Sequence, residues 1–207
     1  MKITCKTTLL PPSFVGTRFD ITLDAGNLTW GIRTCSLHGE STGIDVDWGD
    51  GTRDRVEGSI SGLTHDYAQA GTYSVRISDD VQNMCVSSTE ASSPFVGYAG
   101  RIIRFVSTAT KARSLTASAF QGATRLEMVD LSGSSVSILA ARVFRGCAAL
   151  GGRIDFPNVT GFGQYVFEGC PNHFDLHFAA VNKERIESLP GYKDKFGAVD
   201  ATISFDL

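Results

Sequence analysis

The sequence predicts a mainly β protein in two parts, a β-sandwich over residues 1–90 followed by a short repeat solenoid over residues 91–207. Three observations predict this organisation. Short runs of alternating apolar and polar residues fill the first half, and a motif recurs every 23 or 24 residues in the second. A Ser-rich, linker-like stretch at 87–94 separates the two by composition.

The first half carries the alternation that is typical of strands. In the run 72–78, Tyr73, Val75 and Ile77 alternate with polar residues, which is the period of a strand with one buried face. Similar runs lie at 18–25 and 43–48, and turn signals at 24–27, 49–52 and 68–72 separate them. Short strands between regular turns favour an antiparallel sandwich.

Three spaced groups of residues make this half more specific. They are Trp48-Gly49-Asp50-Gly51-Thr52, then His65 and Tyr67, and then Gly71, Tyr73 and Val75. The pattern resembles the PKD domain, an immunoglobulin-like β-sandwich found on cell-surface and secreted proteins. The resemblance covers residues 44–78, and residues 1–40 either complete the sandwich or form an added strand pair.

Each group has a predicted structural role. Trp48 is large enough to anchor the space between two sheets, and Asp50-Gly51 suits the positive backbone angles of a tight hairpin. Tyr67 is expected as a buried ring whose hydroxyl is hydrogen-bonded, and His65 as a structural residue.

The carboxylates of Asp45, Asp47 and Asp50 are also a weak candidate for a Ca²⁺ site. Asp45 and Asp47 fall on one strand face, Asp50 falls in a turn, and the EF-hand spacing is absent. A turn next to a solvated strand face is therefore the favoured interpretation.

The second half repeats itself. Phe120, Phe144 and Phe167 are spaced 24 and 23 residues apart, and a glycine follows two residues after each of them. The next position holds Ala123, Cys147 or Cys170. A period of this length indicates a solenoid, in which each unit buries its apolar face against the next unit.

This element resembles the BspA-like leucine-rich repeats of bacterial surface proteins over residues 100–178, although Ala123 replaces a cysteine and His173 stands where a leucine is usual. The resemblance implies a buried ladder of the three phenylalanines with Cys147 and Cys170 stacked beside it. Small buried free thiols are the favoured interpretation of these two cysteines, and a disulfide between them is the alternative.

A second register comes from short runs of the form apolar–polar–apolar. Alternation turns the central residue of each run outward, so a parallel stack places these residues in one exposed column. The predicted column consists of Arg104, Asp130, Asp155, His177 and Ser204. It is the predicted ligand-binding surface, and the alternative is a face that is polar only because it is wet. The run 201–207 is predicted to be the closing strand, after a loop or helix at 182–198.

Charge and motifs exclude several classes of function. The net charge is −3 with Lys and Arg scattered, which gives no footprint for nucleic acid, and no apolar stretch is long enough to cross a bilayer. The chain has no GxSxG, HExxH, phosphate-loop or dinucleotide-binding motif, so neither an enzyme nor a cofactor is expected. His173 and His177 are two imidazoles without a third ligand, which is too few for a zinc site.

The expected function is therefore recognition. The leading hypothesis is a bacterial adhesion protein that binds a protein or carbohydrate ligand through the repeats, with the sandwich as spacer. The first 14 residues lack the apolar core of a signal peptide, so a location at the cell surface or outside the cell requires a leader that has been removed. The alternative is a prophage or appendage-type structural protein that self-associates.

Overall fold

The computed structural model describes residues 14–87, 95 and 97–207. These residues form fifteen strands, and their helical segments are no longer than five residues. The prediction of a mainly β protein is confirmed. Nowhere in this described part does a helix combine the length and the apolar character needed to cross a membrane.

The first seven strands pair in antiparallel fashion. They are β1 (Gly16–Leu23), β2 (Thr29–Leu37), β3 (Gly43–Asp47), β4 (Arg53–Glu57), β5 (Ile60–Asp66), β6 (Gly71–Ser78) and β7 (Val81–Cys85). β1 pairs with β6, β6 with β3 and β3 with β4, while β2 pairs with β5 on one side and β7 on the other. The predicted strands at 18–25, 43–48 and 72–78 all lie within this set.

The strands after β7 are mostly short and pair in parallel with one another. They are β8 (Ile102–Ser107), β9 (Ser114–Leu115), β10 (Met128–Asp130), β11 (Ile138–Leu139), β12 (Gly152–Phe156), β13 (Gly161–Phe162), β14 (His173–Phe178) and β15 (Asp200–Phe205). β8 pairs in parallel with β10, β12 with β14, and β14 with β15. β9 pairs in parallel with β11, and β11 with β13.

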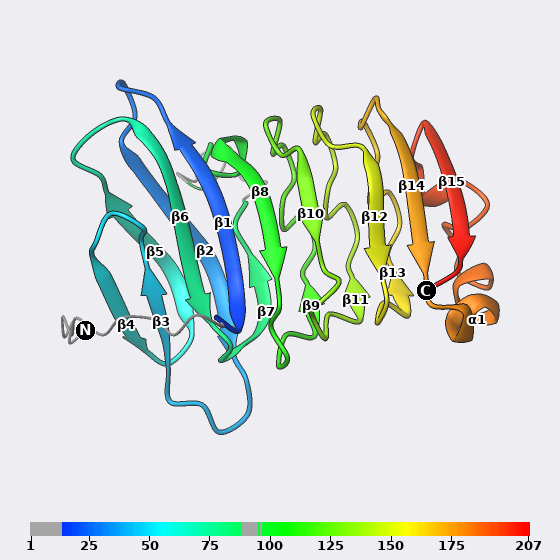
Figure 1. Cartoon of the computed structure of the whole chain (residues 1–207), viewed down its shortest axis with the longest axis horizontal. Helices are drawn as coiled ribbons and strands as arrows, with labels where there is room; N and C mark the ends of the chain where they lie inside the picture. Colours follow the sequence, from blue (N-terminus) through cyan, green and yellow to red (C-terminus); the bar gives the residue numbers. More distant parts are fainter. Residues whose placement is uncertain (1–13, 88–94, 96) are drawn as a thin grey trace.

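The sheets run through both halves of the chain. One sheet has the order β10-β8-β1-β6-β3-β4, a second has the order β13-β11-β9-β7-β2-β5, and a third has the order β12-β14-β15. Figure 1 shows the third sheet in line with the first, and the second sheet behind them. The predicted division at residue 90 and most of the linker at 87–94 lie outside the described residues. The strands on either side are hydrogen-bonded to each other, β1 to β8 and β7 to β9.

One apolar core fills the space between the layers. Trp30 and Trp48 are fully buried, and their rings meet edge to face at 6.4 Å, so Trp48 anchors the core as predicted. Phe19 on β1 contacts Trp30 at 5.6 Å and Phe105 on β8 at 5.2 Å between ring centroids. The core of the antiparallel half therefore continues into the repeats without a break.

The predicted phenylalanine ladder is present. Phe120, Phe144 and Phe167 are fully buried, and successive rings stack at 5.5 Å and 5.7 Å between centroids. The amide of Phe120 donates to the carbonyl of Val143, and the amide of Phe144 donates to that of Val166. Consecutive coils are therefore joined by backbone hydrogen bonds as well as by stacked rings.

Each coil turns through two residues with positive φ. The glycine two residues after each phenylalanine has φ between +70° and +76°, which explains why the repeat keeps glycine there. The residue two positions before each phenylalanine also has φ near +60°, although it is not a glycine. These residues are Ser118, Arg142 and Tyr165.

The cysteines of the described residues are free and buried, namely Cys35, Cys85, Cys147 and Cys170. The thiol of Cys147 donates to the carbonyl of Phe120 at 3.3 Å, and that of Cys170 donates to the carbonyl of Phe144 at 3.1 Å. Each thiol thus bonds the preceding coil of the ladder. The alternative of a disulfide between Cys147 and Cys170 is wrong.

A segment of short helices leads to the last strand. It consists of the 3₁₀ turn Ala180–Asn182, the helix α1 (Lys183–Glu187) and the 3₁₀ turn Lys195–Gly197. The carbonyl of Phe196 accepts the amide of Phe167, and its fully buried ring lies 4.3 Å from Phe162. This segment takes the place of a further coil, and β15 closes the third sheet as predicted.

Candidate ligand-contact face

Three of the five residues in the predicted column are direct neighbours. Asp155 on β12 lies opposite His177 on β14, and His177 lies opposite Ser204 on β15. All three are partly exposed, because the residues on either side of them turn into the core.

The other two residues do not follow the expected register. Arg104 pairs with Met128, and Asp130 pairs with Val106, so Arg104 and Asp130 are two residues out of step along β8 and β10. The expectation that they are direct neighbours is wrong. The hydrogen-bonded offset between these strands is the same 24 residues that separate Phe120 from Phe144, whereas the apolar–polar–apolar pattern suggested 26.

Asp130 has a local partner instead. Its Oδ1 accepts the backbone amide of Ser132 at 2.9 Å and the hydroxyl of Ser132 at 2.6 Å. This carboxylate therefore holds the turn that follows β10, a role that aspartate often has in turns. The continuous part of the predicted surface lies on the third sheet.

The outward side of β12, β14 and β15 is here called the third-sheet face. Two rows cross it in register, Arg153–Asp175–Thr202 and Asp155–His177–Ser204, and a third pairs His173 with Asp200. Asp206 follows at the end of β15. The inward residues between these rows are apolar, among them Ile154, Leu176 and Ala201, which are buried. The face is thus a grid of polar side chains on hydrogen-bonded strands.

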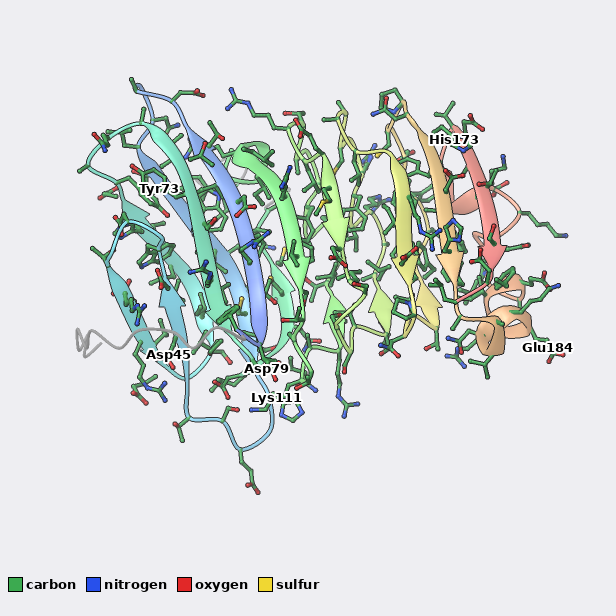
Figure 2. The ribbon with its side chains drawn as sticks, in the orientation of Figure 1. Asp45, Tyr73, Asp79, Lys111, His173 and Glu184 are labelled. Carbon is green, nitrogen blue, oxygen red and sulfur yellow. The ribbon has the colours of Figure 1, made fainter. Side chains whose placement is uncertain are left out.

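His173 bridges two strands of this grid. Its Nδ1 lies 2.8 Å from Asp200 Oδ2, and its Nε2 lies 3.1 Å from Asp175 Oδ1. Both ring nitrogens are donors only in the protonated imidazole, so the two carboxylates favour that form. The hydrogen bonds to Asp200 and then Asp175 raise the pKa of His173 above its ordinary value. Figure 2 places His173 at one end of β14, beside β15.

Hydrogen bonds also lower the pKa of two of the acids. The hydroxyl of Thr202 donates to Asp175 Oδ1 at 2.5 Å, and this bond together with that from His173 lowers the pKa of Asp175. His177 Nδ1 lies 2.7 Å from Asp206 Oδ1, and this bond lowers the pKa of Asp206. Both carboxylates are therefore held ionised at neutral pH.

The two histidines serve different carboxylates. His173 binds Asp175 and Asp200, whereas His177 binds Asp206. Within the described part of the chain, no group of three or more His, Cys, Asp or Glu side chains is arranged to hold a metal ion.

The weak calcium candidate resolves into separate contacts. Asp45 pairs with Arg55 at 2.8 Å, and Asp47 pairs with Arg53 at 3.0 Å. Asp50 accepts the amide of Thr52 at 2.9 Å through Oδ1. These three carboxylates are thus engaged one by one, and they do not converge on a common point.

Asp50 belongs instead to a structural cluster around Trp48. His65 Nε2 lies 2.8 Å from Asp50 Oδ2, and the His65 ring stacks on Trp48 at 4.8 Å. Partial burial acts to raise the pKa of Asp50, but hydrogen bonds from Thr52 and His65 lower it below the ordinary value. The hydroxyl of the buried Tyr67 donates to the carbonyl of Trp48 at 3.1 Å, as predicted. The positive φ angles of this turn are at Gly49 and Gly51, not at Asp50.

Sequence reasoning missed most of the third-sheet face. Arg153, Asp175, Asp200, Thr202 and Asp206 were outside the predicted column. Their alternation with apolar residues was a usable signal, since 173–178 and 200–205 each alternate along a strand. What no local pattern contains is the register that places these residues side by side.

No family model, no curated protein and no solved structure matches this chain.

Proposed function

We propose that this chain is a non-enzymatic recognition protein of the bacterial surface type, which binds a protein or glycan ligand through the third-sheet face. In this proposal the first half is a PKD-like immunoglobulin-type sandwich that acts as a spacer. The second half is a short BspA-like leucine-rich-repeat solenoid that carries the contact surface. Its proposed location is the cell surface or the extracellular space.

Two sets of contacts support the finer fold assignment. The residues that resemble a PKD domain are joined in one cluster, in which Trp48, His65 and Tyr67 contact one another in sequence. The residues that resemble the repeat recur with the same environment, since Cys147 and Cys170 each bond a phenylalanine carbonyl of the preceding coil. Residues that match a motif thus also share the motif's structural role.

The observation that carries the function is the in-register polar grid of the third-sheet face. Its side chains are exposed or partly exposed, and hydrogen bonds fix many of them, including Asp175 between His173 and Thr202. A surface whose side chains are already fixed loses little conformational entropy when it binds a ligand. The fixed grid therefore favours recognition over a merely solvated surface.

The charges of this face indicate the chemistry of the ligand. Four aspartates, Asp155, Asp175, Asp200 and Asp206, are accompanied by Arg153 and two histidines. At neutral pH the acids outnumber the fixed cation, so the face favours a ligand that presents Lys or Arg side chains. None of the outward side chains of β12, β14 and β15 is Phe, Tyr or Trp. We therefore place a protein ligand before a glycan.

Binding of the intact chain to a panel of immobilised extracellular-matrix proteins and glycans tests this proposal. Asp155→Asn removes a charge from the face, where Asp155 pairs with Arg153 at 2.7 Å. Asp24→Asn is the matched control, because Asp24 pairs with Arg125 at 3.2 Å away from the face. We expect Asp155→Asn to weaken binding about 5- to 100-fold, as for loss of one interfacial charge contact. Binding to no member of the panel, or equal binding by both variants, would contradict the proposal.

A structural role by self-assembly, as in a prophage or appendage protein, is the second candidate. The observation that favours it is the edge strand β15, whose residues Ala201–Phe205 carry no charge. Long uncharged edge strands readily pair with other strands.

A further inference from the structure

The open edges of the three sheets differ in how well they resist pairing. In β4 four of the five residues are charged, and β13 has only two residues. β5 contains Gly62, whose φ of +78° interrupts the regular strand. Charge, shortness and irregularity are the ways in which natural proteins protect edge strands. These three edges of the described chain are therefore protected.

The edge strand β15 has none of these protections over most of its length. Within the described residues it pairs with β14 alone, and Figure 1 shows it at one end of the row of strands. Its residues Ala201-Thr202-Ile203-Ser204-Phe205 include three with high strand propensity and contain no Gly, Pro or charged residue.

Apolar side chains are also exposed at this end of the molecule. Val199, just before the strand, is 74% exposed, and Val181 is 90% exposed. Ile203 and Phe205 point towards the core but are only partly buried, because no further strand covers them. An unpaired backbone edge thus lies beside uncovered apolar side chains.

We propose that β15 pairs with β15 of a second copy of this chain, antiparallel and with the two-fold axis at Thr202. This inference does not depend on the proposed ligand binding. Antiparallel pairing about a two-fold axis is the arrangement in which a strand is its own complement.

The register follows from the side chains that each alignment brings together. With the axis at Thr202, Asp200 lies opposite the partner's Ser204, and Ala201 lies opposite the partner's Ile203. The same alignment places Val199 opposite the partner's Phe205, so a small exposed side chain meets a large one. An axis at Ile203 would instead place Asp200 opposite the partner's Asp206, and like charges directly opposite each other are destabilising.

Such a dimer joins the two third-sheet faces into one continuous surface. The two-fold axis is perpendicular to the sheet, so both faces point the same way. One dimer then presents two copies of the acidic grid side by side.

Cysteine cross-linking tests both the contact and its register. Thr202→Cys and Ser204→Cys are prepared in a Cys5→Ser background, since the remaining native cysteines are buried. Opposite residues in an antiparallel pair have Cα atoms about 4.5–5.5 Å apart, within the range of a disulfide. The two thiols of the Ser204→Cys variant would be four residues apart along the pair, about 13 Å, which is too far. We expect Thr202→Cys to form a covalent dimer on mild oxidation and Ser204→Cys to remain monomeric.

Light scattering after size exclusion gives the independent measurement. The unmodified chain should elute at twice the monomer mass, and Thr202→Lys should elute as a monomer because two lysines would meet at the axis. Thr72→Lys on β6, which lies inside the first sheet, is the matched control and should remain dimeric. A monomer for the unmodified chain at all concentrations overturns the proposal. So does a dimer that persists in Thr202→Lys, or one in which the two cysteine variants cross-link equally.

Discussion

The ring of Phe19 on β1 lies 6.1 Å from the ring of Phe120, the first phenylalanine of the repeat ladder, measured between centroids. Phe105 lies between the two halves and contacts both rings, at 5.2 Å and 4.6 Å. The antiparallel strands and the coils therefore share one apolar core, in addition to the hydrogen bonds of β1 with β8 and of β7 with β9.

This shared core predicts that the chain unfolds as one unit. Phe120→Ala should lower the free energy of unfolding by about 3–5 kcal/mol, because it removes a buried ring and leaves a cavity. Both tryptophans, Trp30 and Trp48, are in the first half, so their fluorescence reports on that half alone. In urea titrations of the variant, tryptophan fluorescence and far-UV circular dichroism should shift together. An unchanged fluorescence midpoint would show that the halves are independent. Phe205→Ala, at the half-exposed end of the core, is the control and should have a smaller effect.

The buried thiols predict a clear labelling pattern. Burial, followed by the neighbouring Cys85, raises the pKa of Cys35, and buried thiols are poor nucleophiles. In a Cys5→Ser chain, iodoacetamide should label no cysteine in the native state and four in urea without a reducing agent. Mass spectrometry counts the labels. Two labels in urea would indicate a disulfide and contradict the free thiols.

His173 predicts a dependence of stability on pH. Its pKa is raised in the folded chain by Asp200 and Asp175, so its contribution is complete below the ordinary value of about 6.5 and is lost as the pH rises through the raised pKa. Asp175 and Asp206 have lowered pKa values, so their contributions act above the ordinary aspartate value and are lost as the pH falls. His173→Gln should therefore destabilise the chain more at pH 5.5 than at pH 8.5. Urea midpoints at both values measure this difference, and an equal loss at both would contradict the assignment.

The cluster around Trp48 predicts a structural role for His65. Replacing His65 by Ala removes its stacking on Trp48 and its hydrogen bond to Asp50, and should cost about 1–2 kcal/mol of unfolding free energy. His38→Ala is the matched control, since His38 lies in a turn and contributes backbone hydrogen bonds. Chemical denaturation compares the two variants. If they lose the same stability, the His65 cluster does not stabilise this half.

The sequence contained enough to predict the strands of the first half, the phenylalanine ladder and the closing strand. These depend on local alternation and on a strict repeat, which a single chain displays directly. The positive φ of Arg142 and Tyr165 could not be predicted, because neither residue type favours that conformation, and the surrounding coils impose it. The partners of Asp175 and Asp200 were missed for a related reason. The register that joins β14 to β15 spans a segment of irregular length, and no motif fixes it.

The central claim is that the third-sheet face is the contact surface. Amide hydrogen exchange of the intact chain, with and without the protein or glycan that it binds in the panel, tests this most directly. The account predicts that ligand slows exchange in β12, β14 and β15, and leaves β3 to β6 unchanged. Slower exchange confined to β3 to β6 would place the contact on the first half and contradict it.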